Sequence, residues 1–431
     1  MTIIVMKFGG SCLKDEEAFK RIHKISKLYS KEKKVYVASA FNGITDLLLS
    51  TAQNLDDPIE VDKKIALIER KHLDVIEKIF KRHTEHYDNT KLWLDARLSE
   101  LEDLFTDIKE FGLEPYYKDY ALSFGERIST YILKEYLLSK KFDAEYISGK
   151  DIIITNDQFG NAYPLYELTN NRIKSLLLPL LENPNKNTII CVTGFLGRNK
   201  IGYITTLGRG GSDYTSTIIA RALHRVGKDK DITVILWKDV DGLLAVNPKY
   251  IPNPALIRKI DYEEAKQIAN FGTKILHPKC LEAIEEAKIP LEIRNFNSIL
   301  TNENFTKISS QSDTTQIKGI STVEKAMIIT LVSGSMVDVP GILARIFKIM
   351  GENGISVSFV AQSSSEISTS FIVKEEDSDK SINILRSEEF FSDFYEIKWE
   401  EVAIINITGS KVLENSTKIK IFTALDRNLN Y

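Results

Sequence analysis

The sequence predicts an α/β fold with a mainly parallel sheet flanked by helices, followed by smaller C-terminal α+β modules. Three observations support this prediction. Short apolar runs alternate with helical patterns over residues 1–55, which is typical of βαβ units. Two long amphipathic segments follow between residues 61 and 111. The last part of the chain contains an internal repeat, which indicates two copies of one small unit.

The first domain is predicted to cover residues 1–300. Its first strand is expected at residues 3–8 and its second at 35–38, with helices over 18–28 and from Thr45. Further strands are expected at 152–154, 188–193, 233–237 and 291–294, and further helices near 125–139, 171–182, 212–226 and 262–287. This alternation favours a parallel sheet covered by helices.

Residues 61–111 interrupt this alternation with two helical segments. In the second segment, apolar side chains recur at spacings of four and three residues, at Leu94, Leu98, Leu101, Phe105 and Ile108. This spacing places them on one helical face. We therefore expect a helical hairpin inserted into the first domain.

The C-terminal region is predicted to hold a linker and two related modules. Residues 301–315 are rich in Asn, Ser and Thr, which is typical of a linker. Beyond them the chain aligns with itself: Ile329 with Ile404, Gly334 with Gly409, Val337 with Val412, Ile346 with Ile421, and Asn353 with Asn428. We expect a first module at 316–395 and a truncated second module at 396–431, to whose sheet residues 316–321 would contribute.

Composition excludes several classes of protein. The 431 residues carry a formal net charge of −3, which argues against a protein that binds nucleic acid by neutralising phosphates. No apolar run approaches the ~20 residues needed to span a membrane. Three cysteines lie far apart, at Cys12, Cys191 and Cys280, and suggest a reducing compartment. We expect a cytoplasmic protein without nucleic-acid or membrane partners.

Two glycine-rich segments are candidate anion sites. Lys7 ends the first predicted strand and is followed by Gly9 and Gly10, at the sheet edge where open α/β sheets bind ligands. The second segment reads TTLGRGGSD over residues 205–213 and begins a helix, so backbone N–H groups could hold an anion there. A plain strand-to-helix turn is the alternative for the first segment. Neither segment is a Walker-type phosphate loop.

Weaker signals surround these two segments. Glu126 lies in SFGER at 123–127, and on its own a role as a first-turn helix acid is favoured. Lys238 and Asp239 lie in WKDVDG at 237–242, Lys249 follows shortly, and Lys274 lies in FGTKILHP at 271–278. Taken singly, each of these segments is more typical of a surface turn than of a site.

Taken together, these segments resemble the aspartate kinases (aspartokinases) of the amino-acid kinase superfamily. The resemblance rests on KFGGS at 7–11, ASAFNGIT at 38–45, SFGER, TTLGRGGSD, WKDVDG, FGTKILHP and the C-terminal repeat, which is similar to ACT modules. It implies a three-layer αβα sandwich and ferredoxin-like modules. It also implies ATP- and Mg²⁺-dependent phosphorylation of the β-carboxylate of L-aspartate to 4-phospho-L-aspartate, the first step toward lysine, threonine and methionine.

The resemblance also implies residue roles. Lys7 would contact the transferring phosphoryl group and Asp213 would organise the charges of the active site. Arg209 would bind the α-carboxylate of aspartate and Glu126 its ammonium group. The remaining residues fall into two groups: Ser39, Thr45 and Ser212 would complete the aspartate pocket, and Gly9, Gly10, Gly210, Gly211, Lys238, Asp239, Lys249 and Lys274 would bind the nucleotide. No metal ligand is identified.

Departures from the family pattern bear on the nucleotide and on regulation. Cys12, Leu244 and Asn247 replace residues usual in the family. The resemblance implies a homodimer through the ACT modules and a threonine or lysine effector, with threonine slightly favoured by residues 362–366, QSSSE. The shortened second module suggests weak feedback inhibition. Two alternatives stay open: a kinase of the same fold for another small acid or UMP, and a catalytically silent amino-acid sensor.

Overall fold

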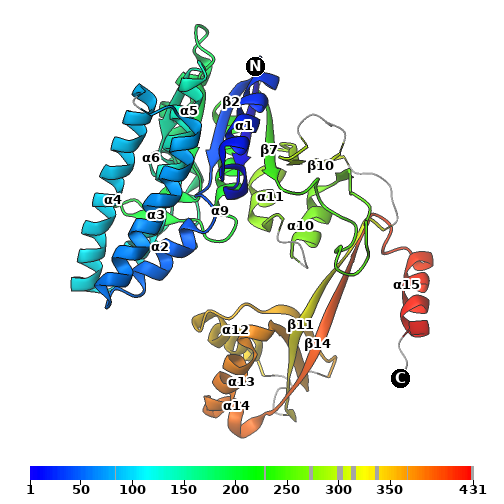
Figure 1. The fold of residues 1–431 in the computed structure, drawn as a ribbon. Helices are drawn as coiled ribbons and strands as arrows, with labels where there is room; N and C mark the ends of the chain where they lie inside the picture. The colour runs from blue at the N-terminus through cyan, green and yellow to red at the C-terminus, as the bar shows by residue number, and fades with distance from the viewer. Residues whose placement is uncertain are drawn as a thin grey trace. The chain divides into compact units, whose positions relative to one another are not determined.

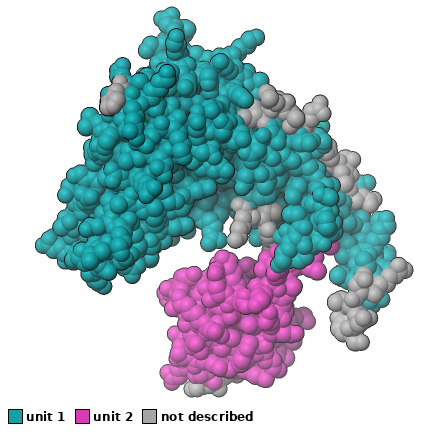
Figure 2. All heavy atoms as spheres, viewed as in Figure 1, with its two compact units in different colours: residues 1–318, 409–431 teal, residues 319–408 magenta. Residues whose placement is uncertain are grey.

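The chain forms two compact units. The computed structural model describes residues 1–82, 84–227, 230–270, 275–298, 304–311, 317–334, 339–365 and 367–428. One unit contains residues 1–318 and 409–431, and the other contains residues 319–408 (Figure 2). This division differs from the expected boundaries at 315/316 and 395/396, because residues 396–408 pair within the sheet of the second unit.

An eight-stranded sheet forms the centre of the first unit. Its strands lie in the order β3-β4-β2-β1-β7-β9-β10-β8. Neighbours from β3 to β9 are parallel, and only the β9–β10 pair is antiparallel. The bounds are β1 (Thr2–Phe8), β2 (Lys33–Ala38), β3 (Ala144–Ile147), β4 (Ile189–Thr193), β7 (Asp231–Lys238), β8 (Lys259–Ile260), β9 (Leu291–Asn295) and β10 (Phe305–Ile308), with β5 (Leu196–Arg198) and β6 (Ile204–Thr206) forming a separate hairpin.

Helices cover both faces of this sheet, so the expected three-layer αβα sandwich is confirmed (Figure 1). Alternate side chains of β1 enter different cores: Met6 and Phe8 pack with the first group of helices, and Ile3 and Val5 with the second. The first group is α1 (Glu16–Leu28), α2 (Ile44–Ala52), α3 (Pro58–Ile79), α4 (Glu85–Phe111) and α5 (Pro115–Ser139). The second group is α6 (Gly149–Ile152), α7 (Tyr166–Leu176), α8 (Leu178–Glu182), α9 (Gly211–Val226), α10 (Tyr262–Asn270) and α11 (Pro278–Glu285).

The expected helical hairpin is present as α3 and α4, which pack side by side (Figure 1). The strand expected at residues 152–154 is wrong. The short helix α6 ends at Ile152, and Ile154 forms only an isolated bridge with Arg198. The sheet edge next to β4 is taken by β3 instead, while Ile152 and Ile153 are buried in the second core.

The second unit has the ferredoxin-like order βαββαβ, with a sheet ordered β12-β13-β11-β14. Its core contains Ile329, Leu331 and Phe371 from the sheet, packed against helices on one face. Its elements are β11 (Gly319–Val332), α12 (Ile342–Glu352), β12 (Ser358–Gln362), β13 (Ser368–Lys374), the 3-10 turn η3 (Glu375–Asp377), α13 (Ser378–Ser387), α14 (Glu389–Phe394) and β14 (Glu396–Thr408).

Strand β14 belongs to both copies of the repeat. Its first half pairs antiparallel with residues 326–332 of β11, and its second half pairs with residues 319–323 beyond a register shift. The repeat aligns β14 with β11, and the following helix α15 (Asn415–Asn428) with α12. The first copy therefore uses as its last strand the strand that begins the second copy.

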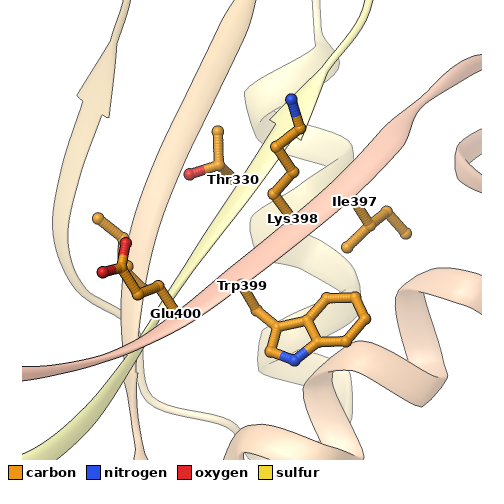
Figure 3. A pocket seen from close by; sticks show the side chains of 6 residues that line it. Thr330, Ile397, Lys398, Trp399 and Glu400 are labelled. Atoms are coloured by element: carbon orange, nitrogen blue, oxygen red, sulfur yellow. The ribbon is translucent and has the colours of Figure 1, made fainter.

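A hollow of about 640 Å³ lies along β14, the outermost strand of this sheet. Its lining includes Thr330, Lys398 and Trp399, and Figure 3 shows Lys398 and Trp399 leaving β14 on opposite sides. None of the described helices has an apolar stretch long enough to cross a membrane.

Candidate active site

The ends of three adjacent parallel strands bring predicted site residues to one edge of the sheet. Lys7 is the second-last residue of β1, and it pairs with Val37 of β2 and Leu236 of β7. Ser39 directly follows β2, and Lys238 is the last residue of β7. Because parallel strands end at the same edge, residues far apart in sequence meet there.

Asp213 bridges two lysines at this edge. Its Oδ1 lies 2.8 Å from Lys7 Nζ, and its Oδ2 accepts a hydrogen bond of 2.6 Å from Lys238 Nζ. Burial alone would raise the pKa of Asp213, but the two ammonium groups lower it to about 2. Burial would likewise lower the pKa of Lys7, yet Asp213 holds it above its ordinary value. Asp213 and Lys7 are therefore both charged at pH 7.

Two glycines in left-handed conformation shape the loop before α9. Gly208 has a φ of 77° and Gly210 a φ of 73°, a region that L side chains rarely adopt. A Cβ on Gly210 would lie 2.7 Å from the Cβ of His277, and one on Gly211 would lie 2.6 Å from Phe195. The loop is thus close-packed at the start of α9, and within it the Gly211 amide donates to the Gly208 carbonyl oxygen at 2.9 Å.

Glu126 is a nearly fully buried acid on α5, with 4% of the residue exposed. Its Oε2 has no hydrogen-bond partner among the described residues. Burial raises the pKa of Glu126 to about 8, although a hydrogen bond from the Ala40 backbone and the charge of Lys7 oppose the increase. A buried carboxyl group with an open oxygen is suited to an incoming ammonium group.

A cavity of about 390 Å³ unites most of the predicted residues. Its lining comprises Lys7, Ser39, Ala40, Thr45, Glu126, Phe195, Gly208, Arg209, Gly210, Gly211, Ser212, Asp213 and Lys238. Both predicted catalytic residues and all five predicted aspartate-binding residues are among them. The exposed Arg209 and the buried Glu126 give this cavity a cation and an acid on different elements.

The other predicted nucleotide residues that the structure describes do not line the cavity. A Cβ on Gly9 would approach Lys7 Nζ to 3.2 Å, so Gly9 lies beside the site. A Cβ on Gly10 would lie 2.8 Å from the Ala40 carbonyl oxygen, which makes Gly10 a packing position for the loop after β2. Asp239 and Lys249 are exposed in the segment after β7. Lys274 lies outside the described residues.

Sequence reasoning missed Phe195 and Asp119. Phe195 lines the cavity with a φ of 69°, and its amide donates to the Thr215 hydroxyl at 2.9 Å. It follows the buried strand β4, so its position at the end of a parallel strand was the available signal. Asp119 lies behind the glycine loop, and the sequence carried no comparable signal for it.

The site suits a nucleotide that brings its own cation. Within the described part of the chain, no cluster of three or more His, Cys, Asp or Glu residues could hold a metal ion. Both oxygens of Asp213 already contact lysines. Mg²⁺ commonly binds through substrate phosphates with few protein ligands, and the two lysines and the loop amides offer positive partners for such phosphates.

Comparison with known proteins gives a consistent result. Residues 2–295 match the amino acid kinase family and residues 329–389 match an ACT domain. A bifunctional aspartokinase/homoserine dehydrogenase of Buchnera aphidicola is 27% identical over 98% of this chain and 51% of that protein. The lysine-sensitive aspartokinase 3 of Escherichia coli is 30% identical over 84% of this chain and 76% of its own length. The chain thus spans about half the length of the bifunctional relative.

A solved structure shares this fold over the whole chain. The crystal structure of E. coli aspartokinase III in complex with aspartate and ADP matches with a TM-score of 0.82 at 26% identity. The match covers 100% of this chain and 93% of that one.

Proposed function

Because the chain belongs to the amino acid kinase family, among its aspartokinases, we propose that it phosphorylates L-aspartate. Mg-ATP would donate its γ-phosphoryl group to the β-carboxylate, giving 4-phospho-L-aspartate, the first step toward lysine, threonine and methionine. The ADP and aspartate named for the E. coli aspartokinase III structure support this choice of substrates.

The observation that carries the proposal is the cavity in which Glu126 and Arg209 meet the Lys7–Asp213–Lys238 bridge. Recognition of an α-amino acid requires an anion for its ammonium group and a cation for its carboxylate, and we assign Glu126 and Arg209 to these roles. Ser39, Thr45 and Ser212 add hydroxyl groups to the same lining.

The chemistry requires charge neutralisation and no general base. A β-carboxylate, with a reference pKa near 3.9, is already ionised at pH 7. Its approach to a polyphosphate brings like charges together, so catalysis depends on positioning and electrostatics. We assign Lys7 to the transferred phosphoryl group, and Asp213 to holding Lys7 and Lys238 in place.

We assign the nucleotide phosphates to the glycine segments that contain Gly9, Gly10, Gly210 and Gly211 and to Lys238. Asp239, Lys249 and Lys274 complete the nucleotide side in this proposal. Mg²⁺ would enter with ATP, and its charge would offset the charge that develops on the phosphates.

We further propose a homodimer formed through the ACT modules, with lysine or threonine as a weak feedback effector. The ACT match at residues 329–389 supports a regulatory module. The relative that is named lysine-sensitive supports lysine, whereas residues 362–366 favoured threonine. The outermost strand β14 offers the backbone of an edge strand to a second chain. The cytoplasmic location stays a proposal, consistent with three free, buried cysteines.

The test is ADP release by the purified chain with Mg-ATP and aspartate, measured with and without lysine and threonine. A hydroxamate trap with aspartate, glutamate and acetylglutamate then identifies the phosphorylated acid. Lys7→Ala and Asp213→Ala should abolish aspartate-dependent ADP release while the protein stays folded. Lys14→Ala, at a side chain that is 54% exposed, is the matched control and should retain activity. Turnover retained in Lys7→Ala would contradict the proposed role of Lys7.

A further inference from the structure

Asp119 is a fully buried carboxylate at the back of the glycine loop. Its Oδ2 accepts hydrogen bonds from the backbone amides of Gly160 at 2.9 Å and Thr206 at 2.7 Å. Its Oδ1 accepts a third, of 2.9 Å, from the Thr206 hydroxyl. Asp119 forms no ion pair within the described chain. Three donors from two separate segments therefore converge on one buried anion.

These segments enclose Gly208, the first glycine of the loop. Thr206 ends β6 two residues before Gly208. The turn containing Gly160 packs on the other side, because a Cβ on Gly208 would lie 3.0 Å from the Gly160 carbonyl oxygen. By holding both Thr206 and the turn of Gly160, Asp119 fixes the position of the residues at which the loop that carries Arg209 begins.

Asp119 also belongs to the helix that carries Glu126. The two acids are seven residues apart on α5, about two helical turns, so they lie on one face of the helix. Helix α5 packs against β6. One end of α5 is thus tied to the loop of Arg209, and the next turns present Glu126 to the cavity.

We propose that Asp119 is a positioning residue that sets the separation between Glu126 and Arg209, and with it the fit of the amino-acid substrate. This inference rests on the proposed aspartate kinase function. It assigns Asp119 to the amino-acid half of the site, because Asp119 lies on the helix of Glu126 and its partner Thr206 leads directly into the loop of Arg209. None of its partners lies on β1 or β7 beside Lys7 and Lys238.

The chemistry of the cluster provides a matched pair of variants. In Asp119→Asn the carbonyl oxygen can keep both amide bonds, and the new NH₂ group can donate to the Thr206 hydroxyl, which accepts as readily as it donates. Asp119→Ala removes all three contacts and leaves the buried amide of Thr206, and the amide of the more exposed Gly160, without their acceptor. Thr206→Val removes the hydroxyl contact alone.

The first test measures steady-state kinetics of these variants. We expect Asp119→Ala to raise the KM for aspartate ~10-fold or more, because small displacements of binding groups are costly. The KM for ATP should rise clearly less, by no more than ~3-fold, because Lys7, Lys238 and the segment of Gly9 and Gly10 would hold the phosphates from outside this loop. Asp119→Asn should stay within ~3-fold of the wild-type KM for aspartate, with Thr206→Val between the two. An unchanged KM for aspartate in Asp119→Ala, with only a lower Tm, would assign Asp119 to folding and overturn the proposal. An equal rise in both KM values would also overturn it.

A second measurement does not depend on catalysis. Hydrogen exchange of the amides at residues 207–212 should be ~10-fold faster in Asp119→Ala than in the wild type or Asp119→Asn. Unchanged exchange there would refute the anchoring. If the wild type showed no aspartate-dependent turnover but Asp119→Ala still loosened this loop, the proposed function would fail while the anchoring stood.

Discussion

Binding of aspartate should release a proton from Glu126. The pKa of this buried carboxyl is about 8, so roughly nine-tenths of the molecules carry the proton at pH 7 before substrate binds. An ammonium group next to the open Oε2 favours the anion. We therefore expect the release of ~0.9 proton per bound aspartate at pH 7. The apparent affinity for aspartate should improve ~10-fold per pH unit up to pH 8 and then level off.

Isothermal titration of aspartate at pH 7 in phosphate and in Tris measures this proton, because the observed heat varies with the ionisation enthalpy of the buffer. Glu126→Gln should bind aspartate weakly and release no proton. Wild-type binding without proton release would refute the reasoning, as would the same release from Glu126→Gln.

The same carboxyl has a consequence for stability. A group whose pKa is raised from 4.5 to about 8 keeps its proton in the folded state while the unfolded state has lost it. Unfolding free energy should therefore fall as the pH rises from 4.5 to 8. Glu126→Gln should lack this decline, so without substrate it should be more stable than the wild type at pH 8 but not at pH 4. Urea titrations at the two pH values measure the difference.

Three further variants test other parts of the site. Asp213→Asn should stop ADP release. It should also lower the free energy of unfolding at pH 7 by about 2.5 kcal/mol, because folding lowers the pKa of the Asp213 carboxyl from 3.8 to about 2. Urea titrations should show this difference between variant and wild type disappearing as the pH falls from 3.8 through 2, and a difference independent of pH would contradict the prediction. Gly10→Ala should reduce kcat at least ~10-fold, because the new Cβ would lie 2.8 Å from the Ala40 carbonyl oxygen. The control Gly351→Ala, in open space on α12, should leave kcat unchanged. Equal effects of the two substitutions on kcat would contradict the packing argument. Arg209→Lys should raise the KM for aspartate ~10-fold with little change in the KM for ATP, because lysine cannot bind a carboxylate through two parallel hydrogen bonds; an unchanged KM would remove Arg209 from the substrate.

Local chain features indicated part of the candidate site. Lys7 and Lys238 lie at the ends of apolar runs, and the structure brings them together because parallel strands end at one edge. For Lys238 the sequence alone favoured a surface turn, and only the family resemblance singled it out. Asp213 was recognisable because it follows three glycines at a helix start. Lys7 and Asp213 are identified by local chain features, which a sequence displays directly.

Residues whose role depends on distant partners could not be found in this way. Asp119 is one acid in the first turns of a long helix, and its three donors come from segments 41 and 87 positions away. Phe195 is recognisable only through its backbone φ and its place in the cavity. Residues 152–154 show the same limit, because their apolar run predicted a strand and tertiary packing instead buried it beside α6.

The C-terminal repeat illustrates a different limit. Sequence alignment of the two copies gives each copy its own first strand, and this suggested a boundary at 395/396. The structure instead uses β14 as the last strand of one βαββαβ unit and the first strand of the next copy. A repeat fixes where similar elements recur, but hydrogen-bond pairing decides to which sheet a strand belongs.

The charges of the site explain why it can exist before its substrates arrive. Lys7 is a buried cation, and such a group is tolerated only with a partner. Asp213 contacts both Lys7 and the partly buried Lys238, so two lysines share one carboxylate at the position proposed for phosphate. Glu126 avoids the cost of a buried anion by holding a proton at neutral pH. Each substrate would then supply the missing counter-charge, since the polyphosphate offsets the lysines and the ammonium group allows Glu126 to ionise. The substrates would thus bind at the positions where the unliganded site lacks a counter-charge. The binding energy gained there favours the arrangement of groups required for phosphoryl transfer.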